Sequence, residues 1–264
     1  MTNNYKVVVA HPDDEIIFFS SVLKNSSQTI ICFSSSEDKD ITTGRQNIKN
    51  QIPLNNFFFL DIPESNVQGT ANWKKPKKNK EGIVVGKNSS FYKKNYVDLK
   101  LKLSKLIHYG EVIYTHNPWG EYGHEEHVQV FHVIMELAKE LNLKVYVNNY
   151  VSNKSYLLMT MEQHLLSDIH HIGIPDLNLN LIFKKLYQSN LCWTWNEDYC
   201  WPKSESFFEI NKYEKYLETK TSRKVIHPLN MLPGNYKTNT FRDIILKILP
   251  ITIKKKIKNL FKSL

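Results

Sequence analysis

At residues 5–15 the sequence reads Tyr5-Lys6-Val7-Val8-Val9-Ala10-His11-Pro12-Asp13-Asp14-Glu15, an apolar run that ends in one imidazole and three carboxylates. Such a short run of β-branched and apolar residues is typical of a strand that is buried on both faces. The apolar residues 16–19 that follow predict a helix. The charged turn therefore lies at the carboxyl end of a central strand, where open α/β sheets bind their ligands.

The residues of this turn suit metal chemistry, but a simpler interpretation exists. One histidine and two or three carboxylates are ligands that hold Zn²⁺, with a carboxylate left over for proton transfer. Aspartates before an apolar run also cap helices, and Pro12 is favoured in a first helical turn. From this stretch alone, both interpretations stay open.

A second cluster of the same kind follows the apolar residues 112–114. It reads Thr115-His116-Asn117-Pro118-Trp119-Gly120-Glu121-Tyr122-Gly123-His124-Glu125-Glu126-His127. His124 and His127 are three residues apart, which places them on one face of a helix start. Three histidines in twelve residues are poor core composition and good metal-site composition. Two strand ends that both present histidine and carboxylate favour a metal site over capping.

These two motifs resemble those of the LmbE-like or PIG-L family of zinc-dependent N-acetylglucosaminyl deacetylases. The family has a His-Pro-Asp-Asp turn after its first strand, as at 11–14, and a His-x-x-His pair after a later strand, as at 124–127. Two motifs in the right context are more specific than either alone. The resemblance implies a zinc-dependent hydrolase that removes the N-acetyl group from an N-acetylated amino sugar. Sugar nucleotides, lipid-linked sugars and glycoconjugates are the implied substrate classes, and the products are a free amine and acetate.

The resemblance also implies a role for each motif residue. The zinc ligands are His11, Asp14 and His127, and Asp13 is the general base that accepts a proton from water. His124 is the second catalytic histidine, which stabilises the oxyanion or protonates the leaving amine.

Three further residues complete the implied site. Tyr122 adds a hydrogen bond to the oxyanion. Glu126 belongs to the substrate-binding residues and orients the catalytic histidine. Arg45 contacts the substrate. Because residues 46–48 lack the glutamate that follows the arginine in the family, a solvated helix arginine is an equal alternative.

The remaining pattern predicts the architecture. Strand-like runs at 29–33, 57–60, 111–115 and 143–150 alternate with helical stretches from Arg45 to Pro53, at 96–108 and at 128–141. This alternation predicts an α/β fold, a Rossmann-like three-layer sandwich with a mostly parallel sheet. Helical patterns at 162–169 and 177–189 follow, with a helical carboxy-terminal extension.

Two basic segments stand out. The long connection at 62–95 carries five lysines between Lys74 and Lys80, which form either a solvated face or a rim that attracts a phosphorylated sugar. The domain is expected to cover 1–240, with its motif-bearing core at 1–150, and a basic amphipathic tail to cover 241–264. Residues 242–264 hold seven basic residues against one acidic residue, with Ile and Leu at helical spacing. This tail either packs on the domain or binds an anionic membrane surface.

Other features give narrower expectations. Trp193, Trp195 and Trp201 predict a core or interface cluster, or a wall on which a sugar stacks. His132 is expected to pack on its helix without binding a metal. The three cysteines are expected to be free thiols.

Composition limits the remaining classes. Of the 264 residues, 41% are hydrophobic and 23% are charged, a composition that is typical of globular proteins. No apolar run reaches the ~18 residues of a membrane span. The first strand starts too early for an export signal, so we expect a cytoplasmic protein, peripheral at the inner face of the membrane if the tail binds lipid. The net charge of +9 comes without a nucleic-acid motif, so no nucleic-acid partner is expected. The alternative to an enzyme is a catalytically idle sugar-binding or scaffold protein of the same fold.

Overall fold

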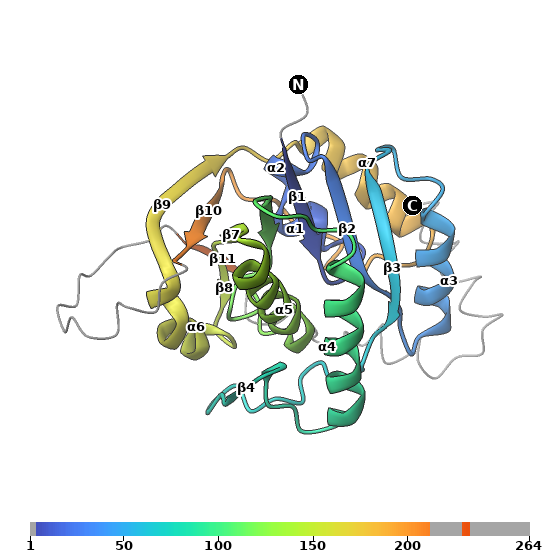
Figure 1. Cartoon of the computed structure of the whole chain (residues 1–264). Helices are drawn as coiled ribbons and strands as arrows, with labels where there is room; N and C mark the ends of the chain where they lie inside the picture. The colour runs from blue at the N-terminus through green and yellow to red at the C-terminus, as the bar shows by residue number, and fades with distance from the viewer. Residues whose placement is uncertain (1–3, 212–228, 233–264) are drawn as a thin grey trace. The chain divides into compact units, whose positions relative to one another are not determined.

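The computed structural model describes residues 4–211 and 229–232. Their centre is a seven-stranded sheet with the strand order β3-β2-β1-β6-β7-β10-β9 (Figure 1). Five strands run parallel: β1 (Tyr5–Val9), β2 (Gln28–Ser35), β3 (Phe57–Pro63), β6 (Val112–Thr115) and β7 (Lys144–Asn148). Two antiparallel strands complete one edge: β10 (Glu205–Ile210) and β9 (Leu166–Gly173). The predicted mostly parallel sheet is confirmed.

Strand β1 lies in the middle of the sheet, as its sequence predicts. Val7, Val8 and Val9 have no exposed surface. Val8 pairs with Ile30 of β2 on one side and with Thr115 of β6 on the other. The chain proceeds from β1 to β2 in one direction and later from β6 to β7 in the other, so the topological switch point lies between β1 and β6.

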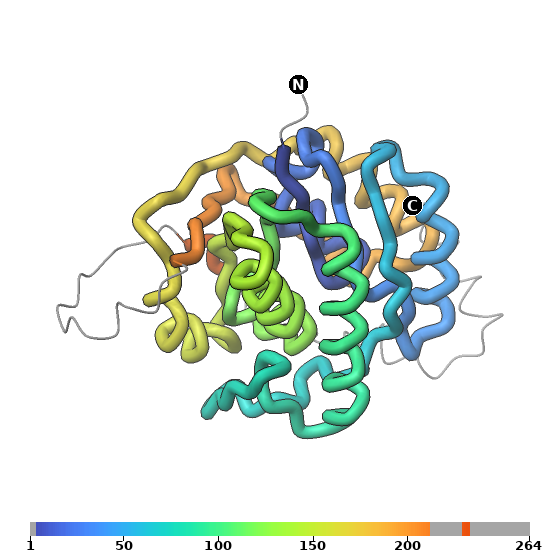
Figure 2. The backbone as a smooth tube through the Cα atoms, viewed as in Figure 1, coloured from blue at the N-terminus to red at the C-terminus, as the bar shows by residue number. Residues whose placement is uncertain are grey.

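Helices cover both faces of this sheet. α4 (Ser89–Leu103) and α5 (Glu125–Leu141) lie on one face, in front of the sheet in Figure 1. The smooth trace in Figure 2 shows the other layer behind the sheet. That layer consists of α1 (Asp14–Phe18), α2 (Ser20–Leu23), α3 (Lys39–Ile48) and α7 (Leu177–Ser189). The result is the predicted three-layer α/β sandwich.

Two predicted helices begin earlier than expected. α3 starts at Lys39 because the Asp38 carboxylate accepts hydrogen bonds from the backbone N–H groups of Asp40 (2.9 Å) and Ile41 (3.3 Å). α4 covers 89–103, where 96–108 was expected, and its Tyr92 and Leu99 are buried in the core.

The helix predicted at 162–169 is wrong. α6 (Tyr156–Glu162) and a short 3-10 turn (Gln163–Leu165) lead directly into strand β9. β9 pairs antiparallel with β10, where His171 lies opposite Phe207. Phe207 and Phe208 of β10 are fully buried. The hydrogen bonds that residues 166–173 make with this buried strand favour the extended conformation over the helix that their own sequence pattern favours.

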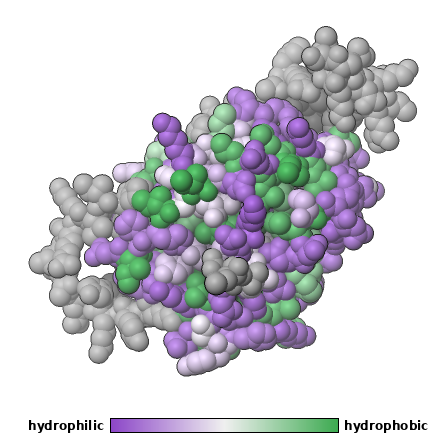
Figure 3. Space-filling view, turned by 90° about the horizontal axis from the view of Figure 1, so that it is seen from above, coloured by the Kyte–Doolittle hydropathy of each residue, from purple (hydrophilic) through white to green (hydrophobic). Residues whose placement is uncertain are grey.

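Smaller pairings complete the described part. The segment 62–95 contains the hairpin of β4 (Lys78–Asn79) and β5 (Gly82–Ile83), and β8 (Tyr150–Ser152) pairs with β11 (Asn230–Leu232). Seen from above, hydrophilic areas of the surface enclose apolar ones (Figure 3). Within residues 4–211 and 229–232, no helix has the length and apolarity needed to cross a membrane. The predicted tail at 241–264 lies outside the described residues, as does the boundary at residue 240.

Candidate metal centre and active site

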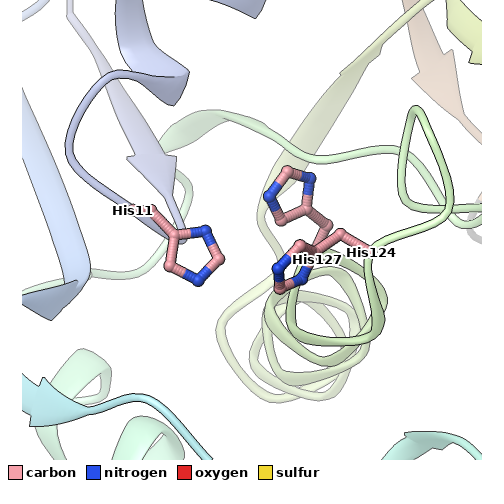
Figure 4. Close-up of side chains that lie close together, drawn as sticks. All are labelled: His11, His124 and His127. Carbon is pink, nitrogen blue, oxygen red and sulfur yellow. The ribbon is translucent and has the colours of Figure 1, made fainter. Parts of the chain in front are cut away.

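The two sequence motifs meet at the carboxyl ends of β1 and β6, beside the switch point. His11 lies in the turn after β1, whereas His124 and His127 lie at the start of α5. Figure 4 shows these three imidazoles facing one another across a narrow space. The ring centre of His11 lies 4.7 Å from the ring centre of His124 and 5.3 Å from the ring centre of His127.

The turn after β1 contains two aspartates that make different contacts. The backbone N–H of His11 donates to Oδ2 of Asp14 at 2.8 Å, which closes the turn. Asp13 has a φ of 99°, a left-handed conformation that non-glycine residues rarely adopt. Its side chain makes no capping hydrogen bond to α1, so the structure does not support capping as the role of Asp13.

The start of α5 fixes His124 as a hydrogen-bond donor. His124 is the N-cap residue, and its Nδ1 accepts from the backbone N–H of Glu126 at 3.2 Å, which leaves the proton on Nε2. Burial lowers the pKa of His124 well below its usual value, and the neighbouring His11 and His127 lower it further. His124 is therefore a neutral ring with one N–H to offer.

Asp14 is the centre of the cluster. Its Oδ2 lies 3.3 Å from Nδ1 of His11, 3.2 Å from Nε2 of His127 and 3.6 Å from Nε2 of His116. All four side chains are buried. Two overlapping groups of donors have their ligand atoms within 4.8 Å of one another: His11 with His124 and His127, and Asp14 with His116 and His127.

Hydrogen bonding decides which of these atoms is available to a metal. His116 uses Nε2 to accept from the backbone N–H of Ala10 at 2.8 Å, and His124 uses Nδ1 as described. Nε2 of His127 is buried and has no hydrogen-bond partner among the described residues. Burial lowers the pKa of His127, but the Asp14 and Glu121 carboxylates raise it to about 9, so a metal at this nitrogen would displace a proton. An unpartnered imidazole nitrogen beside a carboxylate fits a divalent metal such as zinc.

Glu121 holds this arrangement in place, although it was not singled out in the sequence. It has no exposed surface, and its Oε2 lies 2.7 Å from Nδ1 of His127 and 3.1 Å from Nδ1 of His116. Its Oε1 accepts from the backbone of Asn117 (3.0 Å) and the side chain of Asn148 (2.6 Å). A carboxylate on Nδ1–H turns the free Nε2 of a histidine toward a metal.

The surroundings of Glu121 favour its ionised form. Burial alone would raise its pKa, but the adjacent His116 and His127 rings lower it to about 2. Its one sequence signal is a carboxylate between two glycines, which reads equally well as part of a turn.

Asp13 has the properties of a general base. It is 1% exposed, and burial together with the Asp14 charge raises its pKa to about 7, against the lowering effects of Arg45 and Thr194. A base is most effective when its pKa is near the working pH. Its Oδ2 accepts from both the backbone N–H (3.1 Å) and the hydroxyl (2.6 Å) of Thr194, a residue the sequence did not point to.

Arg45 and Glu126 lie next to the site, each bound to a partner. Arg45 is 3% exposed and pairs with Glu64, so a solvated helix arginine is wrong. Glu126 places its carboxylate 2.9 Å from Nε2 of His11, and Ser65 donates to it from both backbone and hydroxyl. Only the backbone N–H of Glu126 reaches His124, and the substrate-binding roles of both residues stay predictions. Glu64 and Ser65 directly follow β3, which was the available signal for them.

An aromatic group borders the cluster. The ring of Tyr122 lies 5.3 Å from His127 and 5.1 Å from Trp195, measured between centres. Trp195 also packs edge-on against Phe18 at 5.4 Å. His132, by contrast, packs against Phe131 and belongs to neither donor group.

The connection at 62–95, which carries the lysines, is hydrogen-bonded to Glu125 at the start of α5. Oε1 of Glu125 accepts from the backbone of Ala71 (2.9 Å) and the indole of Trp73 (3.0 Å), and its Oε2 accepts from the backbone of Gly69 (3.0 Å). The lysines from Lys74 to Lys80 are exposed, and Lys78 pairs with Glu162. Their action on a substrate stays a prediction.

Comparison with known proteins gives one family match and one structural likeness. The family model "PIG-L: GlcNAc-PI de-N-acetylase" matches residues 6–138, which include both motifs. A solved structure, that of the antimicrobial reagent A40926 pseudoaglycone deacetylase Dbv21, is similar with a TM-score of 0.45 and 9% identity, over 80% of this chain and 99% of that one. No curated protein sequence matches. Because the family model covers half of the sequence and the two motifs within it converge on one buried cluster, the chain belongs to the PIG-L family of de-N-acetylases.

Proposed function

We propose that the protein is a zinc-dependent hydrolase that removes the N-acetyl group from an N-acetylated amino sugar. The observation that carries the proposal is the buried Nε2 of His127, which makes no hydrogen bond among the described residues and lies 3.2 Å from Oδ2 of Asp14, with a second buried carboxylate, Asp13, next in the chain. A ligand set and a separate base in one buried turn are what metal-assisted amide hydrolysis needs. Family membership supports the same chemistry.

The residues divide the work as follows. His11, Asp14 and His127 would hold zinc, which when bound supplies Lewis-acid chemistry that polarises a carbonyl and makes water acidic near neutral pH. Asp13 takes a proton from water as the water oxygen attacks the acetyl carbon. His124 offers its Nε2–H to the developing oxyanion. Asp13 then passes that proton to the sugar nitrogen as the carbon–nitrogen bond breaks, and the free amine leaves with acetate as the second product.

Tyr122 and the rim define the substrate in this proposal. The Tyr122 hydroxyl adds a hydrogen bond to the oxyanion, and Arg45 and Glu126 serve the substrate side. The half-buried Trp195 next to Tyr122 supports a sugar, because apolar sugar faces pack on indoles. The exposed lysines of the 62–95 connection would favour a phosphorylated or lipid-linked form.

A proposal for the location rests on the sequence of the basic tail at 241–264. We propose a cytoplasmic protein whose basic tail gives it peripheral contact with the inner face of the membrane. Flotation with anionic and neutral liposomes tests this, comparing the full chain with one that ends at Asn239. Failure of the full chain to float on anionic vesicles at low salt would remove the membrane contact.

Amine release from a panel of acetylated sugars tests the activity itself. The panel holds free chitooligosaccharides, sugar nucleotides and lipid-linked sugars, and the protein is used after chelation and after reloading with Zn²⁺. We expect acetate and amine in equal amounts only after reloading. Sugar binding without release, in a zinc-loaded protein, would favour the idle sugar-binding alternative.

A further inference from the structure

The segment 192–201, which connects α7 to β10, reaches back to the turn that follows β1. It lies outside the residues that the family model matches. Thr194 donates two hydrogen bonds to a single atom, Oδ2 of Asp13: one from its backbone N–H (3.1 Å) and one from its hydroxyl (2.6 Å). A residue 181 positions later in the chain thus contacts the carboxylate that we propose as the base.

Aromatic side chains that follow Thr194 anchor this segment on α1. The indole of Trp201 donates to the carbonyl of Ile16 at 2.5 Å, and the hydroxyl of Tyr199 donates to the carbonyl of Ile17 at 3.3 Å. Trp195 packs against the ring of Phe18, as described above. All three contacts are made to α1, directly after Asp13 and Asp14, so the segment and the turn are held as one unit.

Rotation of the Asp13 side chain is what this contact restricts. In the described part of the chain, the two hydrogen bonds that its carboxylate accepts both go to Oδ2. Oδ1 is therefore the oxygen left for the substrate water. A base has to be held in a narrow range of orientations, because small misplacements cost much of its effect.

We propose that Thr194 is a positioning residue for Asp13: it holds Oδ2 so that Oδ1 faces the water that attacks the acetyl carbon. This inference rests on the proposed function. Thr194 itself is exposed, whereas Asp13 is buried. A contact of the hydrophobic core would bury both residues. The Thr194 hydroxyl therefore contributes to the orientation of the Asp13 carboxylate and little to core packing.

Exchange of the hydroxyl tests the proposal in the zinc-loaded protein. Thr194→Val keeps the β-branched shape and the backbone N–H but removes the shorter hydrogen bond, and Thr194→Ser restores a hydroxyl. We expect kcat to fall roughly tenfold or more in the valine variant, with KM within about twofold, and to recover in the serine variant. Thr160→Val is the matched control, because Thr160 is exposed and its hydroxyl donates to a local acceptor, the carbonyl of Leu157.

Two results would overturn the proposal. The first is a wild-type kcat for Thr194→Val together with an inactive Asp13→Asn. In that case Asp13 is needed for the reaction, but Thr194 does not position it. The other is an equal loss in the serine and valine variants together with a lowered Tm, which would mark a structural role.

A stability measurement keeps the inference testable if the wild type releases no amine from any sugar, in which case the proposed function fails separately. The unfolding equilibrium is measured for Thr194→Val, Asp13→Ala and the double variant. The bond predicts that the two effects couple by roughly tenfold in the unfolding constant. Additive effects would show that Thr194 does not hold Asp13.

Discussion

Replacement of Glu121 by glutamine tests how the site holds His127. From the described residues, the Glu121 carboxylate accepts four hydrogen bonds, all from N–H groups: two from imidazoles on Oε2 and two from Asn117 and Asn148 on Oε1. A glutamine amide has one oxygen and one NH₂ group. Whichever way it is turned, its NH₂ group faces two donors, so two hydrogen bonds are lost.

The magnitude follows from burial. A buried hydrogen bond to a charged group contributes about 1.5–3 kcal/mol, so the loss of two lowers the free energy of unfolding by roughly 3 kcal/mol or more. For a unit of this size, that lowers Tm by about 6–12 °C. If the NH₂ group faces the imidazoles, Nδ1 of His127 has to accept a hydrogen bond, so the ring keeps its proton on Nε2, the nitrogen beside Asp14. Metal affinity then falls roughly 10- to 100-fold.

Two assays measure these effects separately. Calorimetry in the presence of a chelator gives Tm of the metal-free protein, and competition with a chromophoric chelator gives the zinc affinity. Glu140→Gln is the control, because Glu140 is an exposed carboxylate paired with Lys100. A Glu121→Gln protein with wild-type Tm and wild-type zinc affinity would refute the role of Glu121.

Three further predictions concern charge and proton transfer. Asp13→Asn should keep its zinc but lose about 10²–10⁴-fold in turnover, because an amide cannot accept the proton of water; a nearly active variant would remove Asp13 as the base. Reversal of Lys75, Lys77 and Lys78 to glutamate should raise KM for a phosphorylated sugar more than for a neutral one, and less so in high salt; equal effects would make these lysines a solvated face. The pKa of Glu121 is lowered from 4.5 to about 2, so its contribution to stability is complete above pH 4.5 and is lost as the pH falls toward 2. Acid titration of Glu121→Gln should lack that part of the loss, and identical curves would contradict the assignment.

The sequence predicts the centre of the fold well, because there local pattern and tertiary environment agree. Three consecutive valines suit a strand buried on both faces, and β1 is that strand. His11 and His127 follow neighbouring parallel strands, whose carboxyl ends meet at one edge of the sheet. Their convergence therefore follows from the order of the strands.

The remaining parts of the site depend on contacts between distant residues. Thr194 and Glu64 reach the cluster through the packing of α7 and β3, and a threonine or a glutamate alone carries no sign of such a contact. Arg45 shows the same limit: its helix reads as polar, yet Glu64 pairs with it in the interior. The strand at 166–173 was missed because its pairing partner, β10, lies more than thirty residues further along the chain.

Metal content of the purified protein shows whether Asp14 and His127 hold zinc. Wild type, Asp14→Asn and His127→Gln are loaded with Zn²⁺, dialysed and analysed by mass spectrometry, with His132→Gln as the control histidine on the same helix. We expect about one zinc per chain in wild type and in His132→Gln, and a small fraction of that in Asp14→Asn and His127→Gln. A full complement of zinc in both Asp14→Asn and His127→Gln would contradict this expectation.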